Sequence, residues 1–102
     1  GSGSDMIVGI QSSKFGLVHV TCSSGKNPNG KIGGWKPHDL EMCTAIDHLA
    51  FVWEGAESRV MIFLLEKLSA LKLAKACHGN YAKEDIRNIA FKSKSYHHET
   101  TS

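Results

Sequence analysis

The sequence predicts a small α+β domain made of an N-terminal β-hairpin, a Gly-rich loop and three α-helices, with the second helix central. Three observations support this class: alternating apolar residues before position 23, clustered Gly and Asn at 23–34, and helix-like apolar spacing after Pro37. The chain has 102 residues, 41% of them hydrophobic, which suits one domain with a modest core. We expect residues 1–5 to be a cloning scar, 6–92 the single domain, and 93–102 a frayed polar tail.

The hairpin is predicted from two apolar stretches, 6–11 and 17–22, joined by a turn at 12–16. In the second stretch Val18, Val20 and Cys22 alternate with more polar residues, as in a strand with one buried face. Residues 23–34 then hold four glycines, a proline and two asparagines, a composition typical of loops. Because loops of this length are often functional, this segment is the leading candidate region.

The three helices are predicted from apolar spacing. The first should begin at Pro37 and end at Gly55, since one stripe recurs every three or four positions: Leu40, Cys43, Ile46, Leu49 and Trp53. The second should span 57–77, with one apolar face made of Met61, Leu64, Leu65, Leu68, Leu71 and Ala74. Because residues 60–65 are apolar all round, this helix should lie at the centre of the core or in a homodimer interface. The third should span 81–92.

The candidate binding residues come from the Gly-rich region and the last helix. They combine cations, amide side chains and one aromatic ring: Lys26, Asn27, Asn29, Lys31, Trp35, Lys36, Arg87 and Lys92. Gly25 to Lys31 match the spacing of a phosphate-binding loop, but Ile32 stands where a magnesium-binding hydroxyl is required. We therefore do not expect nucleotide hydrolysis.

Cysteine and histidine are the residue types that most often form metal sites and nucleophilic catalytic sites. Three cysteines at wide spacing lack the paired spacing of zinc sites and predict neither a metal site nor a disulfide framework. Cys43, Asp47 and His48 are close in sequence, but Cys43 lies on the stripe expected to face the core, where thiols are inert. We assign no catalytic residue, no metal ligand and no cofactor.

These observations favour a non-enzymatic binding module that engages a protein partner, of inhibitor, adaptor or regulatory type. The alternative is nucleic-acid binding through Lys26, Lys31, Lys36 and the basic last helix, which should be weak because the net charge is only +2. A third class is a small enzyme whose Cys and His residues converge in the fold. With no apolar run of about 20 residues, no membrane span is expected. The odd number of cysteines suits the cytoplasm.

Overall fold

A computed structural model describes residues 9–22, 31–54 and 60–99, and its main feature is a mixed five-stranded sheet rather than a central helix. The predicted fold class is therefore wrong. The sheet has the order β1-β2-β4-β5-β7, in which only β2 and β4 are parallel. Its strands are β1 (Gly9–Ser12), β2 (Gly16–Cys22), β4 (His48–Glu54), β5 (Val60–Glu66) and β7 (His97–Glu99).

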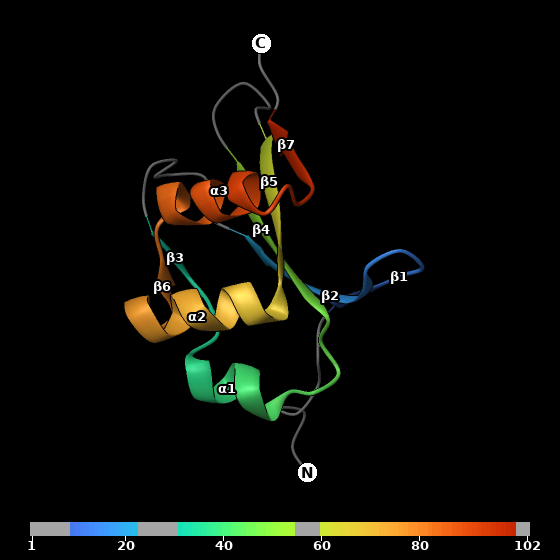
Figure 1. Cartoon of the computed structure of the whole chain (residues 1–102), viewed down its shortest axis with the longest axis vertical. Coiled ribbons are helices and arrows are strands. Elements are labelled where there is room, and N and C mark those ends of the chain that lie inside the picture. The colour runs from blue at the N-terminus through green and yellow to red at the C-terminus, as the bar shows by residue number, and fades with distance from the viewer. Residues whose placement is uncertain (1–8, 23–30, 55–59, 100–102) are drawn as a thin grey trace.

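Three short helices form a layer on one side of this sheet, in the order α1, α2 and α3 from one end of the molecule to the other (Figure 1). Their bounds are α1 (Pro37–Met42), α2 (Lys67–Cys77) and α3 (Lys83–Lys92). A separate two-stranded ribbon joins β3 (Ile32–Gly33) to β6 (Asn80–Tyr81). In the described part of the chain, every helix is too short or too polar to cross a membrane.

The error in fold class arises from two segments that were predicted as helix and form the antiparallel strands β4 and β5. A short apolar run fits a buried strand as well as a buried helix, so spacing alone cannot separate the two. The helical stripe was misleading because its members do lie in the core but come from different elements. Leu40 belongs to α1, Ile46 to a loop, and Leu49 and Trp53 to β4; all four are at most 2% exposed.

The segment 57–77, which was predicted as one helix, contains β5 followed by α2. The predicted homodimer interface required a continuous helix over these residues, and the structure has no such helix there. In β5 successive side chains point to opposite faces of the sheet, so Phe63 and Leu65 meet the helices while Leu64 belongs to the other face. Leu68, expected inside, is 71% exposed on α2. The apolar run at residues 60–65 therefore belongs to a strand inside the sheet, whose two faces are both apolar.

The core lies between the sheet and the helix layer. Phe51, Trp53 and Phe63 from the central strands are fully buried there, and the ring of Phe51 lies 4.9 Å from that of Tyr81. The helices contribute small or apolar residues, among them Ala70 and Ala74 from α2 and Ile86 and Ala90 from α3. The small alanines allow α2 to lie close to the aromatic residues of the sheet.

Two other local predictions can be compared with the structure. The N-terminal hairpin is present, since β1 and β2 pair antiparallel, and α3 occupies most of the helix predicted over 81–92. Within the segment 93–102, residues 97–99 pair with β5, and the amide of Leu64 donates to the carbonyl of Tyr96 (3.0 Å). The last strand therefore borders β5 on the side away from β4.

Asp47 connects the hairpin to β4. Its carboxylate accepts a hydrogen bond from the amide of Leu17 (3.0 Å), and its own amide donates to the carbonyl of Leu17 (2.9 Å). Gly16 has a φ of +72°, and a Cβ at this position would overlap the Asp47 carboxylate. Both the backbone angle and the contact therefore require glycine.

Replacing Gly16 by alanine is expected to lower the free energy of unfolding by about 1–3 kcal/mol, because alanine is strained at positive φ. Urea denaturation measures the change. Gly33→Ala is the matched control: nothing lies within 4 Å of the added methyl group, so a change below about 0.5 kcal/mol is expected. Equal stability of the two variants would show that neither the backbone angle nor the space at position 16 requires glycine.

Candidate functional site

The binding residues predicted in the Gly-rich region are only partly within the described chain. Lys26, Asn27 and Asn29 lie outside it. Lys31 is exposed beside β3, and residues 32–33 form that strand instead of continuing the predicted loop. Lys36 is exposed immediately before α1.

The side chain of Trp35 packs within the fold and is not a freely exposed aromatic ring. It packs against the core, its ring lies 4.7 Å from that of His19, and its carbonyl accepts a hydrogen bond from the Tyr81 hydroxyl (2.6 Å). Burial lowers the pKa of His19, which favours the neutral ring in this stack. Trp35 therefore joins the β3–β6 ribbon to the sheet.

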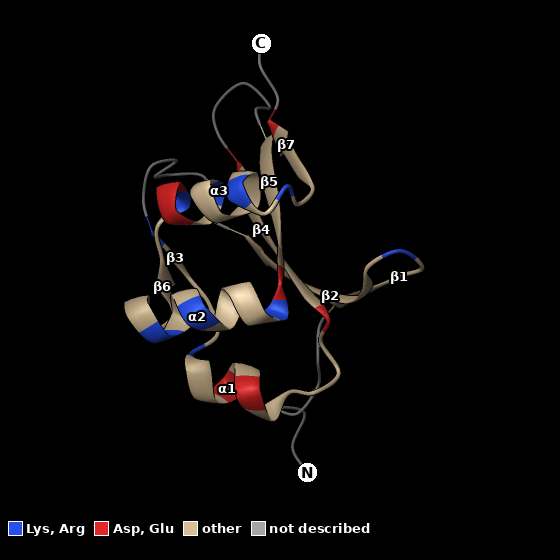
Figure 2. Ribbon diagram, viewed as in Figure 1, with Lys and Arg blue, Asp and Glu red and all other residues tan. Residues whose placement is uncertain are grey.

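The two predicted residues of α3 are separated from Lys36. Arg87 forms an ion pair with Glu99 of β7 (2.8 Å) and lies over the Phe91 ring at 4.3 Å. The hydrogen bond to Glu99 raises the pKa of Arg87. Lys92 is exposed at the end of the same helix. Lys and Arg are spread over α2, α3 and the segment before α1, with Asp and Glu between them, and form no single basic cluster on the described elements (Figure 2).

The Cys, Asp and His residues near position 45 also act within the fold. His48 directs Nδ1 to the carbonyl of Phe15 at 2.7 Å, and the carbonyl of Cys43 accepts a hydrogen bond from the Lys67 ammonium. Cys22, Cys43 and Cys77 are free thiols. Within residues 9–22, 31–54 and 60–99, no group of three or more Cys, His, Asp or Glu residues is arranged to hold a metal ion.

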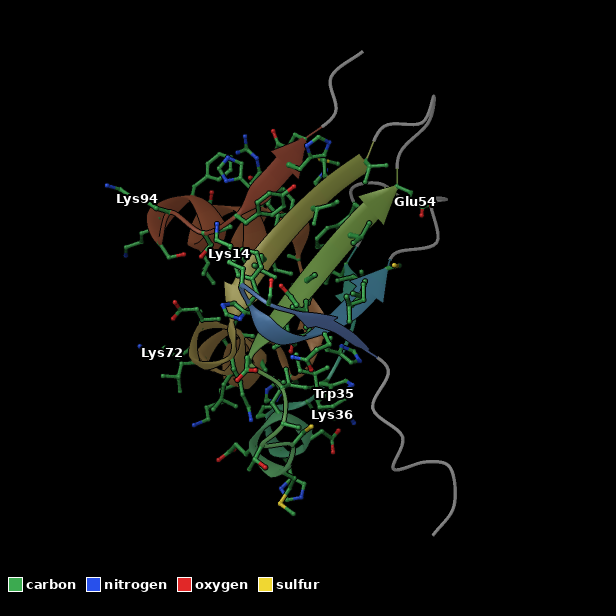
Figure 3. All side chains as sticks on the ribbon, turned by 90° about the vertical axis from the view of Figure 1, so that its right-hand side faces the viewer. Lys14, Trp35, Lys36, Glu54, Lys72 and Lys94 are labelled. Carbon is green, nitrogen blue, oxygen red and sulfur yellow. The ribbon has the colours of Figure 1, made fainter. Side chains whose placement is uncertain are left out.

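The face of the sheet opposite the helices forms an apolar trough that sequence reasoning missed. Its floor consists of alternate residues from three adjacent strands: Val18 and Val20 of β2, Ala50 and Val52 of β4, and Ile62 and Leu64 of β5. Ile10, Phe15 and Tyr96 complete the lining of this trough, which has a volume of about 320 Å³. Ile10 is 62% exposed and Tyr96 52%, so large apolar side chains here meet solvent. Figure 3 views the strands with the helices behind them.

A second, polar pocket of about 380 Å³ adjoins the trough at the His48 end of β4 and shares Phe15, Leu64 and Tyr96 with it. Its other lining residues are polar or charged: Lys14, His48, Glu66, Ser93, Lys94 and Ser95. Glu54 ends β4 on the opposite side of the trough, away from Lys14 and Lys94 (Figure 3). The trough thus has a basic end and an acidic end.

Part of this site had a signal in the sequence. The alternation of Val18 and Val20 marks one face of β2, and the two-sided apolar run at 60–65 indicates a strand with both faces apolar. The position of Tyr96 had none, since it depends on β7 pairing with β5.

Comparison with known proteins gives no further assignment: the chain matches no protein-family model, no curated protein and no solved structure.

Proposed function

We propose that this protein is a non-enzymatic module that binds a partner protein, and that an apolar helix of the partner lies in the trough on the open face of the sheet. The observation that carries the proposal is the trough itself, whose floor is entirely apolar. A sheet with one apolar face normally buries it against a second layer. Here the three helices form that layer on the other face (Figure 1).

The dimensions of the trough favour a single helix. Three strands about 4.8 Å apart give a floor roughly 10 Å wide, which is the diameter of one α-helix. The side of β4 that faces the trough runs from His48 in the adjoining polar pocket to Glu54, so the trough and the pocket together extend over about 23 Å, the length of a helix of roughly 15 residues. Val18, Ala50 and Leu64 of the floor are buried at 5–8% exposure, so the partner helix contacts mainly the more exposed residues of the trough, Ile10, Val20, Val52, Ile62 and Tyr96.

Hydrophobic contact with a partner is the expected source of affinity. Ile10 and Tyr96 are exposed apolar anchors at the two sides of the floor, and each contributes area that binding removes from water. A helix has its own backbone hydrogen bonds satisfied, so it covers the trough without burying unpaired amides. A cytoplasmic location, with the three thiols reduced, is part of this proposal.

The test uses a displayed library of 18-residue amphipathic helices with Leu, Ile or Ala on one face and random residues elsewhere. Helices selected by the wild-type protein should bind Ile10→Asp at least tenfold more weakly, since the variant places a carboxylate in the apolar wall. Titration followed by NMR measures the affinity and locates the bound face. Gln11→Asp is the matched control, because Gln11 is exposed on the same strand and alternates to the other face.

The outcomes of this experiment distinguish a partner helix from a second copy of the chain as the occupant of the trough. Selected helices that shift resonances of Val20, Val52 and Ile62 support the proposal. A library that yields no helix binding more tightly than about 100 μM overturns it. Concentration-dependent dimerisation that protects the same three residues would assign the trough to a second copy of the chain instead.

A further inference from the structure

The polar pocket beside the trough contains a pair of neighbouring residues from the two central strands. His48 is the first residue of β4 and Glu66 the last of β5, and the two are direct partners in the register of these antiparallel strands. Directly paired residues lie on the same face of a sheet, with their Cβ atoms about 5 Å apart. Alternation along the strands puts the pair on the face of Ala50 and Leu64, so both side chains adjoin the apolar floor.

The ring of His48 has one nitrogen that the fold uses and one that it does not. Nδ1 lies 2.7 Å from the carbonyl oxygen of Phe15, and because a carbonyl only accepts, Nδ1 carries the proton. In the neutral ring Nε2 then has no proton and is an acceptor. No described residue donates to it. The contact between the rings of Phe15 and His48, with centroids 5.4 Å apart, further fixes the orientation of the imidazole.

The carboxylate of Glu66 is also without a donor from the described chain. Glu66 is the N-cap residue of α2 but makes no side-chain capping hydrogen bond. Lys67, next along the chain, donates its ammonium to the carbonyl of Cys43 instead. The Ser93 hydroxyl, which lines the same pocket, donates to the carbonyl of Ile89 (2.7 Å). The pair therefore offers two acceptors, one of them charged, at the end of an apolar trough.

The positive charge at this end of the trough comes from two exposed lysines, and neither of them pairs with Glu66. The Lys14 ammonium lies over the ring of Phe15 at 5.3 Å. The side chain of Lys94 is turned away from the trough (Figure 3). Within the described chain, neither ammonium is within ion-pair distance of the Glu66 carboxylate. The two acceptors thus remain for a donor that comes from outside the chain.

We infer that the pair formed by His48 and Glu66 binds a basic side chain, Lys or Arg, of the partner helix; the inference rests on the proposed function. An ammonium or guanidinium group carries several N–H donors, so it can bond to Nε2 and to the carboxylate at once. Its charge is opposite to that of Glu66, which strengthens the second of these hydrogen bonds. A carboxylate from the partner would instead bring a like charge to Glu66 and no donor for Nε2.

A helix in the trough carries this side chain directly to the pair. The trough and the pocket are continuous, since they share Phe15, Leu64 and Tyr96. Two residues along a strand separate His48 from Ala50, a distance of about 6.7 Å, and one helical turn rises about 5.4 Å. The basic residue therefore lies about one turn beyond the last apolar residue that contacts the trough.

The experiment uses the same displayed library, with the first and last turns of the 18-residue helix randomised. Selection on the wild-type protein should enrich Lys or Arg in a terminal turn. A peptide so selected should bind Glu66→Gln about three- to fivefold more weakly than the wild type, as expected for an exposed charge-assisted contact. When its basic residue is replaced by Met, wild type and Glu66→Gln should bind it equally, because the contact is then absent from both complexes.

Three further variants locate the contact. Glu41→Gln removes the same charge from an exposed site on α1, in the helix layer, and should leave affinity unchanged. Glu54→Gln removes it from the other end of the trough and should have less effect on the same peptide than Glu66→Gln (Figure 3). His48→Asn keeps an amide donor for the Phe15 carbonyl and removes Nε2, so it should weaken the basic peptide and not the Met peptide.

Failure of this inference is distinct from failure of the proposed function. Helices that bind the trough with equal affinity for wild type and Glu66→Gln overturn the site at His48 and Glu66 alone. The same holds if Glu66→Gln weakens the basic peptide and the Met peptide equally, or if the loss follows Glu54→Gln instead. Enrichment of Asp or Glu in the turn that shifts the His48 resonances also overturns it. A library with no binders overturns both proposals.

Discussion

Replacing Phe63 by alanine is expected to lower the free energy of unfolding by about 3–5 kcal/mol, the largest effect of any change considered for this protein. Phe63 is fully buried on β5, and its ring lies 6.2 Å from that of Trp53 on the neighbouring strand. Truncation removes apolar contact and leaves a cavity between the sheet and the helices, which small residues such as Ala70 cannot fill. Urea denaturation followed by tryptophan fluorescence measures the loss.

Leu68→Ala is the matched control for this measurement. A continuous helix over 57–77 would place Leu68 on the buried face with Leu64 and Leu65, whereas the structure leaves it 71% exposed at the start of α2. We therefore expect Leu68→Ala to change stability by less than about 0.5 kcal/mol. A larger loss for Leu68→Ala than for Phe63→Ala would contradict the strand assignment of residues 60–66.

Local elements of the fold were accessible from the sequence, and the sheet was not. The β1–β2 hairpin and α3 depend on turn residues and spacing within a short stretch of chain. The central strands β4 and β5 pair with each other, five residues apart in sequence, and also with the distant strands β2 and β7. Residues 60–65 satisfy both a buried helix and a buried strand, and the pairing with β4 on one side and β7 on the other decides between them.

The residues of the candidate site were also predicted only in part from the sequence. The lysines of the Gly-rich region and of α3 form a set in the sequence, but in the fold they lie on separate elements: Lys36 immediately precedes α1, beside Gly79, and Lys92 ends α3. The trough required knowledge of which face the helices cover. Val18 and Val20 gave a partial signal through their alternation, while the exposed position of Tyr96 arises from the chain after α3.

Above pH 10, the stability that Tyr81 contributes is expected to disappear. Burial, with a smaller electrostatic effect from the nearby Cys77, raises the pKa of Tyr81 from its ordinary value of 10.0 to about 12. The folded state holds the phenolic proton more tightly than the unfolded state does. The contribution is thus fully present below pH 10 and is lost as the pH rises from 10 to 12. Two pH units correspond to roughly 2–3 kcal/mol.

Tyr81→Phe isolates this contribution from the other groups that titrate in alkali. At neutral pH the variant should be less stable by about 1 kcal/mol, because it lacks the hydrogen bond from the hydroxyl to the carbonyl of Trp35 (2.6 Å). Between pH 10 and 12 the wild type should lose stability faster than Tyr81→Phe, so that the two curves converge and then cross. Urea denaturation at a series of pH values gives both curves. A difference that stays constant from pH 8 to 12 would show that the Tyr81 hydroxyl ionises as readily in the folded protein as in the unfolded chain.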